Sequence, residues 1–81
     1  MKLNELLSKV ESDAGKLLLM YLHKVGTATV DQISEKFGWT KMKTYNIINS
    51  LREEDFVAPL EHSSQDRYAL KQVTLWNYAQ D

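Results

Sequence analysis

The sequence has 81 residues, no cysteine and a net charge of −1 at pH 7. A chain of this length predicts one small domain, and the lack of cysteine excludes disulfides, thiolate metal sites and thiol nucleophiles. We expect no membrane span, because the longest apolar run is Leu17–Leu22, and no signal peptide, because the N-terminus lacks an apolar core. The near-neutral charge argues against indiscriminate nucleic-acid binding but permits binding through one basic face.

Residues 1–11 predict a short amphipathic helix. Its apolar residues recur at helical spacing and are Leu3, Leu6, Leu7 and Val10. A helix of roughly ten residues is unstable alone. Its apolar stripe must therefore cover either the domain's own core or a second copy of the chain.

The next segment predicts the central core helix. Ser12 or Asp13 can cap its start, and Gly26 ends it. Its expected apolar face consists of Ala14, Leu17, Leu18, Tyr21, Leu22 and Val25.

A helix-turn-helix unit follows the short strand stub Thr27–Ala28. Thr29 and Gln32 form a capping box for a helix over about residues 30–37, which Gly38 ends. Thr40 caps the next helix, which we expect to reach Glu54 and call the third helix, counting from the core helix. Two helices joined by so short a turn with a glycine are typical of this unit.

The third helix is predicted to have two different faces. Its inner residues are Thr44, Ile47, Ile48 and Leu51, whereas Lys43, Asn46, Asn49 and Ser50 lie opposite. Residues 39–52 hold three basic residues and no acid, within a chain of ten basic and eleven acidic residues. We interpret it as a DNA-reading helix; the alternative is an ordinary solvated surface helix.

The C-terminal third predicts a β-hairpin and a tail. Residues 56–60 read as a strand that Pro59 confines to a sheet edge, residues 61–66 as a polar turn, and residues 67–71 as an alternating strand. Tyr68 and Leu70 are expected to face one side, and Arg67, Ala69 and Lys71 the other. Residues 72–81 are expected to form a short helix against the N-terminal helix or a second subunit. The fold class is therefore α+β, mostly α.

The order of elements resembles the winged helix-turn-helix family. The stretch GTATVDQISEKFGWTKMKTYNIINSLREEDFV carries the resemblance, which covers about residues 13–71. It looks most like the DNA-binding domains of TrmB-type archaeal sugar regulators, and MarR-type regulators share its outline. The resemblance implies a winged domain over residues 12–71, flanked by the N-terminal helix 1–11 and the helical tail 72–81.

Three features depart from that family. The wing is acidic, with Glu61 and Asp66, where the family is usually basic. Asp55 replaces the glycine that usually ends the third helix, and no ligand-binding domain follows. We therefore expect no small-molecule effector within this chain. A winged helix that binds left-handed DNA is set aside. Such a domain would have Asn and Tyr four residues apart on the third helix and a Pro-Pro-Trp wing, whereas here Tyr45 and Asn49 are in the reverse order and the wing lacks that motif.

The resemblance implies a reading surface on the third helix and the wing. Asparagine amides suit adenine edges, lysines suit guanine or phosphate, and the start of a helix can hold a phosphate. The candidate DNA-binding residues are Thr40, Lys41, Lys43, Tyr45, Asn46, Asn49, Ser63, Ser64 and Arg67.

Enzyme chemistry is not expected. His62, Ser63, Ser64 and Asp66 include triad residue types, but they share one exposed turn that has no buried orienting acid and no oxyanion donors. The two histidines lie more than thirty residues apart in a chain without cysteine, so no zinc site is expected, and no catalytic residue, metal or cofactor is predicted.

The predicted function is sequence-specific double-stranded DNA binding by a cytoplasmic, nucleoid-associated transcriptional regulator. So few cations per chain favour a homodimer through the N- and C-terminal segments, which would read a short inverted repeat. The alternative is a winged-helix module that binds a protein partner instead of DNA; chromatin or single-strand binding also stays open.

Overall fold

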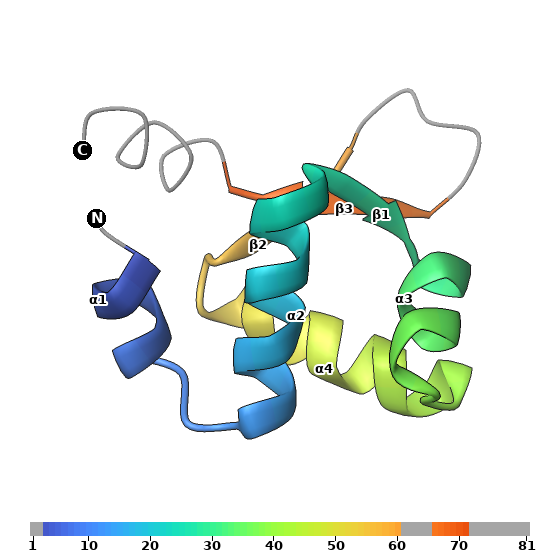
Figure 1. The fold of residues 1–81 in the computed structure, drawn as a ribbon, viewed down its shortest axis with the longest axis horizontal. Coiled ribbons are helices and arrows are strands. Elements are labelled where there is room, and N and C mark those ends of the chain that lie inside the picture. Colours follow the sequence, from blue (N-terminus) through green and yellow to red (C-terminus); the bar gives the residue numbers. More distant parts are fainter. Residues whose placement is uncertain (1–2, 61–65, 72–81) are drawn as a thin grey trace.

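The structure is a computed structural model that describes residues 3–60 and 66–71 (Figure 1). The predicted hairpin turn (61–65) and helical tail (72–81) lie outside the described residues. The described elements are the helices α1 (Leu3–Ser8), α2 (Asp13–Val25), α3 (Val30–Phe37) and α4 (Lys41–Glu53) and the strands β1 (Thr27–Thr29), β2 (Val57–Pro59) and β3 (Arg67–Leu70). This confirms the predicted α+β class.

The three strands form an antiparallel sheet in the order β1-β3-β2. Ala69 of β3 pairs with Thr27 on one side and with Ala58 on the other. Pro59 lies on the edge strand β2, as predicted, because proline cannot donate to a ladder. Since β3 is central, Ala69 is buried together with Tyr68 and Leu70.

The core helix α2 buries a different face from the one predicted. Ser12 caps it by accepting a hydrogen bond from the Gly15 N–H, and Gly26 ends it at φ 88°. The buried residues are Gly15, Leu18, Leu19 and Leu22. Leu17 and Val25 were wrongly predicted to face inward, since they are 49% and 45% exposed. The sheet and α4 cover one side of a run that is apolar on every side, so periodicity could not identify the buried side.

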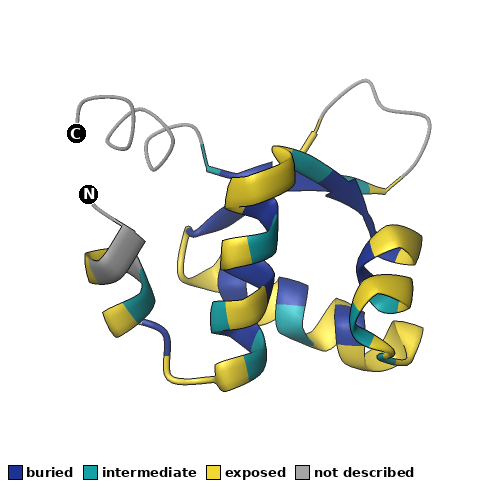
Figure 2. Ribbon diagram, in the orientation of Figure 1, coloured by how far each residue is buried: buried dark blue, intermediate teal, exposed yellow. Residues whose placement is uncertain are grey.

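The segment from α1 to α2 packs on the domain's own core. The connection between the two helices is partly buried (Figure 2). Leu7 is partly buried against the core and Val10 is buried within it. A Cβ atom at Gly15 would lie 2.9 Å from Val10 Cγ1, so the glycine permits this close approach. The side chains of Leu3 and Leu6 lie outside the described set.

The predicted helix-turn-helix signals are confirmed by the structure. Thr29 and Gln32 form the reciprocal capping box of α3, with bonds of 2.9 and 3.1 Å. Gly38 ends α3 in the left-handed region at φ 69°, where glycine lacks the steric penalty of a Cβ atom. Thr40 caps α4. The short turn consequently places α4 directly after α3 and against α2.

Candidate nucleic-acid interface

The inner face of α4 is held by buried contacts. Thr44 and Ile48 are fully buried, and Leu51 is nearly so. The Thr44 hydroxyl donates to the Thr40 carbonyl at 2.9 Å and lies 2.8 Å from the Ser34 hydroxyl. A hydroxyl has one proton to donate, so Ser34 must donate to Thr44. This pair joins α3 to α4 and sets the pose of the outer face.

The outer face of α4 carries a ridge of exposed side chains. Met42, Asn46 and Asn49 are spaced by four and three residues, the spacing of one helix face. Met42 is 75% exposed. Met42 was not among the predicted DNA-binding residues, although its spacing to the two asparagines could have placed it on the same face. We call these three residues the neutral ridge.

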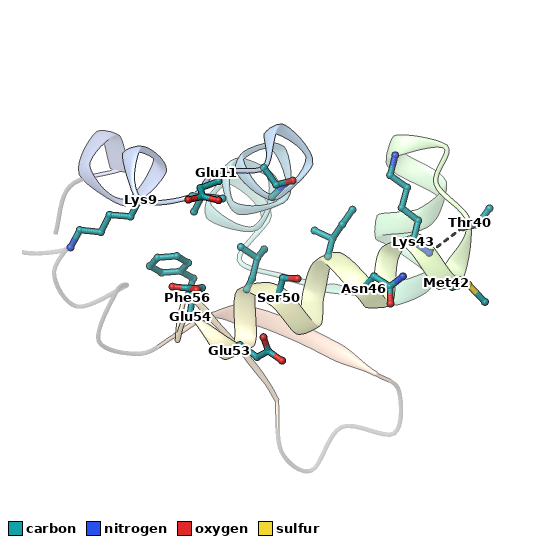
Figure 3. A pocket seen from close by; sticks show the side chains of 15 residues that line it. Lys9, Glu11, Thr40, Met42, Lys43, Asn46, Ser50, Glu53, Glu54 and Phe56 are labelled. Carbon is teal, nitrogen blue, oxygen red and sulfur yellow. Dashed lines mark hydrogen bonds between the residues drawn. The ribbon is translucent and has the colours of Figure 1, made fainter.

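The start of α4 combines a cap with an aromatic support. Thr40 Oγ1 accepts a hydrogen bond of 3.1 Å from the Lys43 N–H (Figure 3). The Lys43 ammonium lies 5.5 Å from the centre of the Trp39 ring, within the range of a cation–π contact. Trp39 stacks on Phe37, which meets Tyr21 edge to face. Lys43 is thus placed to the side of the neutral ridge.

Two carboxylates approach α4 from other elements. Lys41 forms an exposed ion pair of 3.1 Å with Asp31 of α3. The Tyr45 hydroxyl donates a 2.8 Å hydrogen bond to Asp66, the residue before β3. That bond is the main cause that raises the pKa of Tyr45, with desolvation and the charge of Asp66 adding to it. The basic character predicted for α4 is therefore partly offset by acids distant in sequence.

The candidate wing residues are only partly described. Arg67 is half-buried, and its Nη1 donates a 3.1 Å hydrogen bond to Thr27 Oγ1. The guanidinium of Arg67 thus links β3 to β1. Ser63 and Ser64 lie outside the described residues.

A groove of about 740 Å³ runs between the α1–α2 connection and α4 (Figure 3). Val10, Gly15, Ile47, Leu51 and Phe56 contribute its apolar lining. Its polar lining consists of Lys9, Glu11, Ser12, Thr40, Lys43, Asn46, Ser50, Glu53 and Glu54, and Met42 lines it as well. The groove therefore shares part of its wall with the outer face of α4.

Within residues 3–60 and 66–71, no three histidine, cysteine or carboxylate side chains gather as metal ligands would. None of the helices in these ranges has the length and apolarity to cross a membrane.

The helices α2, α3 and α4, the short turn before α4, and the antiparallel sheet define a winged helix-turn-helix fold. Among solved structures, HmgR of Pseudomonas aeruginosa is similar, with a TM-score of 0.67 and 18% sequence identity. The match covers 80% of this chain and 27% of HmgR. Such a likeness concerns the fold alone. No protein-family model and no curated protein matches the sequence.

Proposed function

We propose that this chain is a sequence-specific double-stranded DNA-binding protein that regulates transcription in the cytoplasm. In this proposal α4 enters the major groove, where each base pair presents a distinct pattern of donors and acceptors. The wing at residues 61–67 contacts the DNA backbone, with Ser63, Ser64 and Arg67 as its candidate contacts. The TrmB-type resemblance of the sequence agrees with this reading.

The main support for this proposal is that α4 has one buried face and one exposed face. Thr44, Ile48 and Leu51 are buried, so α4 is fixed to the body of the domain. Asn46 and Asn49 are exposed on the other side, and none of the described residues hydrogen-bonds to their amide groups. A rigid helix with an exposed polar face is the element that helix-turn-helix proteins place in the groove.

The remaining candidate residues have separate roles in this proposal. Thr40 and the start of α4 would face a phosphate, because a helix N-terminus favours an anion. Lys41 and Lys43 would contact phosphates or guanine edges, and Tyr45 a phosphate or sugar. Phosphate contacts add affinity without sequence preference, whereas Asn46 and Asn49 would select bases.

The test is a titration of the full chain with mixed duplex DNA at two salt concentrations. Log K should fall with log salt by about 0.9 per neutralised phosphate. Lys43→Ala should weaken all duplexes alike, whereas Asn46→Ala should relax preference at one base pair.

A paired charge reversal tests the position of the interface. Lys41→Glu/Lys43→Glu should abolish binding, and the matched control Lys16→Glu/Lys24→Glu makes the same charge change on α2. If the α4 pair bound duplexes as tightly as the control pair, α4 would not be the reading element.

A homodimer is part of this proposal, because one domain with so few cations would bind weakly. Its two α4 helices would read half-sites about one helical turn apart. Sedimentation should give a dimer at micromolar concentration, and a strict monomer at high concentration would contradict this part.

The second candidate is a protein-interaction module. Two observations favour it: Asp31 and Asp66 lie beside α4, and Leu17 and Met20 are exposed on α2. Absence of any salt-dependent duplex binding would select this candidate over the first.

A further inference from the structure

The side chains of the neutral ridge carry no formal charge. Met42, Asn46 and Asn49 are all exposed on the side of α4 opposite the buried residues Thr44 and Ile48. In Figure 3 the side chain of Lys43 extends away from those of Met42 and Asn46. The ridge that would enter the major groove of DNA therefore offers amide groups and one apolar side chain for contacts with bases.

The cations beside the ridge are held by contacts of their own. The ammonium of Lys41 pairs with Asp31 at 3.1 Å, on the side of α3. The ammonium of Lys43 lies over Trp39 at 5.5 Å. Guanine presents two acceptors in the major groove and is best matched by arginine or lysine. Such cations stand at the flanks of α4 here, so the centre of its outer face is poorly suited to guanine.

The chemistry of the ridge matches an A·T base pair instead. An asparagine amide offers one donor and one acceptor, which complement N7 and N6 of adenine. Thymine alone presents a methyl group in the major groove. Met42 is apolar, adaptable in shape and largely in contact with water, so packing against that methyl group would remove apolar area from water.

The length of the ridge limits how many base pairs it can read. From Met42 to Asn49 it spans about 10 Å along the helix axis, at 1.5 Å per residue. That length corresponds to about three base-pair steps of 3.4 Å. One domain can therefore place these three side chains on neighbouring base pairs.

We propose that α4 reads a half-site core of A·T base pairs, with Met42 against a thymine methyl group and Asn46 and Asn49 on adenine. This inference rests on the proposed DNA binding and names the class of target. Met42 is then a specificity-determining residue, and the sequence preference depends on the 5-methyl group as well as on hydrogen bonds.

The test begins with selection of duplexes from a random pool by the full chain. Each thymine of the selected duplex is then replaced, one at a time, by deoxyuridine, which lacks only the methyl group. Replacement of the contacted thymine should weaken binding about fourfold, the effect of one buried methyl-sized group. Met42→Ala should bind the thymine and deoxyuridine duplexes equally, and Met42→Leu should keep the difference. As a matched control, Lys43→Ala should weaken both duplexes while preserving their ratio.

Two outcomes would overturn the inference and are distinguishable. Selection of a G·C core, or equal binding of all deoxyuridine duplexes by the unsubstituted chain, would refute A·T reading while leaving DNA binding intact. Failure to enrich any duplex, together with no salt-dependent binding, would refute the proposed function and this inference with it. Because Met42 is exposed, its substitution should leave the helical circular dichroism unchanged, which separates loss of reading from loss of fold.

Discussion

The Tyr45 hydroxyl donates a 2.8 Å hydrogen bond to Asp66 Oδ2, which joins α4 to the start of β3. The backbone carbonyl of Asp66 also accepts from the Val30 N–H at 3.1 Å. One residue at the base of the wing thus contacts the first residue of α3 and the outer border of α4. Asp66 therefore helps to fix α3 and α4 relative to the start of β3.

The first prediction concerns the titration of Tyr45. The bond to Asp66 favours the protonated phenol and raises its pKa above the ordinary value near 10. The folded state then binds this proton more tightly than the unfolded state, so the stabilising contribution is fully present below about pH 10 and is lost as pH rises through the raised pKa. The tyrosinate absorbance difference between the unsubstituted chain and Tyr45→Phe should report that pKa. Asp66→Ala should return it toward the ordinary value, and an unchanged titration would show that the bond does not form in solution.

The second prediction concerns the charge of Asp66. Asp66→Asn keeps an acceptor oxygen for Tyr45 but removes a negative charge beside α4. If the wing approaches DNA, affinity should rise by up to about fivefold at low salt, the equivalent of about 1 kcal/mol. The gain should shrink at high salt because exposed charges are screened. Glu5→Gln, on the exposed side of α1, makes the same charge change as a control. Equal effects of the two variants would place the base of the wing away from the DNA.

The signals that predicted the fold are local in the chain. The capping box of Thr29 and Gln32, the left-handed Gly38 and the cap Thr40 each depend on residues within four positions, so the sequence alone identifies them. The edge position of Pro59 follows from its missing N–H. These signals sufficed to predict the helix-turn-helix and the edge strand.

The features that the sequence could not reveal depend on packing between distant segments. The run around Leu17 and Leu19 is apolar on all sides, and only the positions of β3 and α4 decide which leucine is buried. The approach of Asp31 to Lys41 and of Asp66 to Tyr45 likewise requires the tertiary fold. The count of charges within residues 39–52 therefore overstated how basic the surroundings of α4 are, because it left out Asp31 and Asp66.

The third prediction concerns the hydroxyl pair between α3 and α4. Thr44→Val keeps the shape of the side chain but removes both hydrogen bonds of a fully buried hydroxyl. The free energy of unfolding should fall by about 1–3 kcal/mol. Ser34→Ala should cost less, because Thr44 keeps its bond to Thr40. Urea unfolding of both single variants and the double variant should give a coupling energy, whereas the exposed control Ser50→Ala should change stability by less than about 0.5 kcal/mol. Additive losses would refute the pair.

The fourth prediction concerns the end of α4. Asp55 has φ 64°, a left-handed conformation that glycine adopts without the steric cost of a Cβ atom. Asp55→Gly should raise the free energy of unfolding by up to about 1 kcal/mol. The variant also loses the exposed 2.7 Å ion pair with Lys71, which contributes about 0–1 kcal/mol. Asp55→Asn tolerates the same backbone without the charge, so its thermal unfolding isolates the ion pair. If Asp55→Gly lowered the free energy of unfolding by more than Asp55→Asn does, the backbone at position 55 would not be strained.

The last prediction concerns the contact between Gly15 and Val10. Alanine normally stabilises a helix interior relative to glycine by up to about 1 kcal/mol. Here the added Cβ atom would lie 2.9 Å from Val10 Cγ1 and 3.4 Å from Leu51 Cδ2, and overpacking of a filled site costs about 1–3 kcal/mol. Gly15→Ala should therefore lower the free energy of unfolding by about 1–2 kcal/mol.

A second substitution separates that clash from a general effect on α2. In the Gly15→Ala background, Val10→Ala should cost less than it does alone, because the smaller side chain relieves the contact. Urea unfolding of the four variants in this cycle measures the coupling, and Lys16→Ala is the helix-propensity control. A stabilising Gly15→Ala would mean that Val10 does not pack on α2 in solution. The apolar stripe of residues 1–11 would then be available to a second copy of the chain, the alternative that a dimer requires.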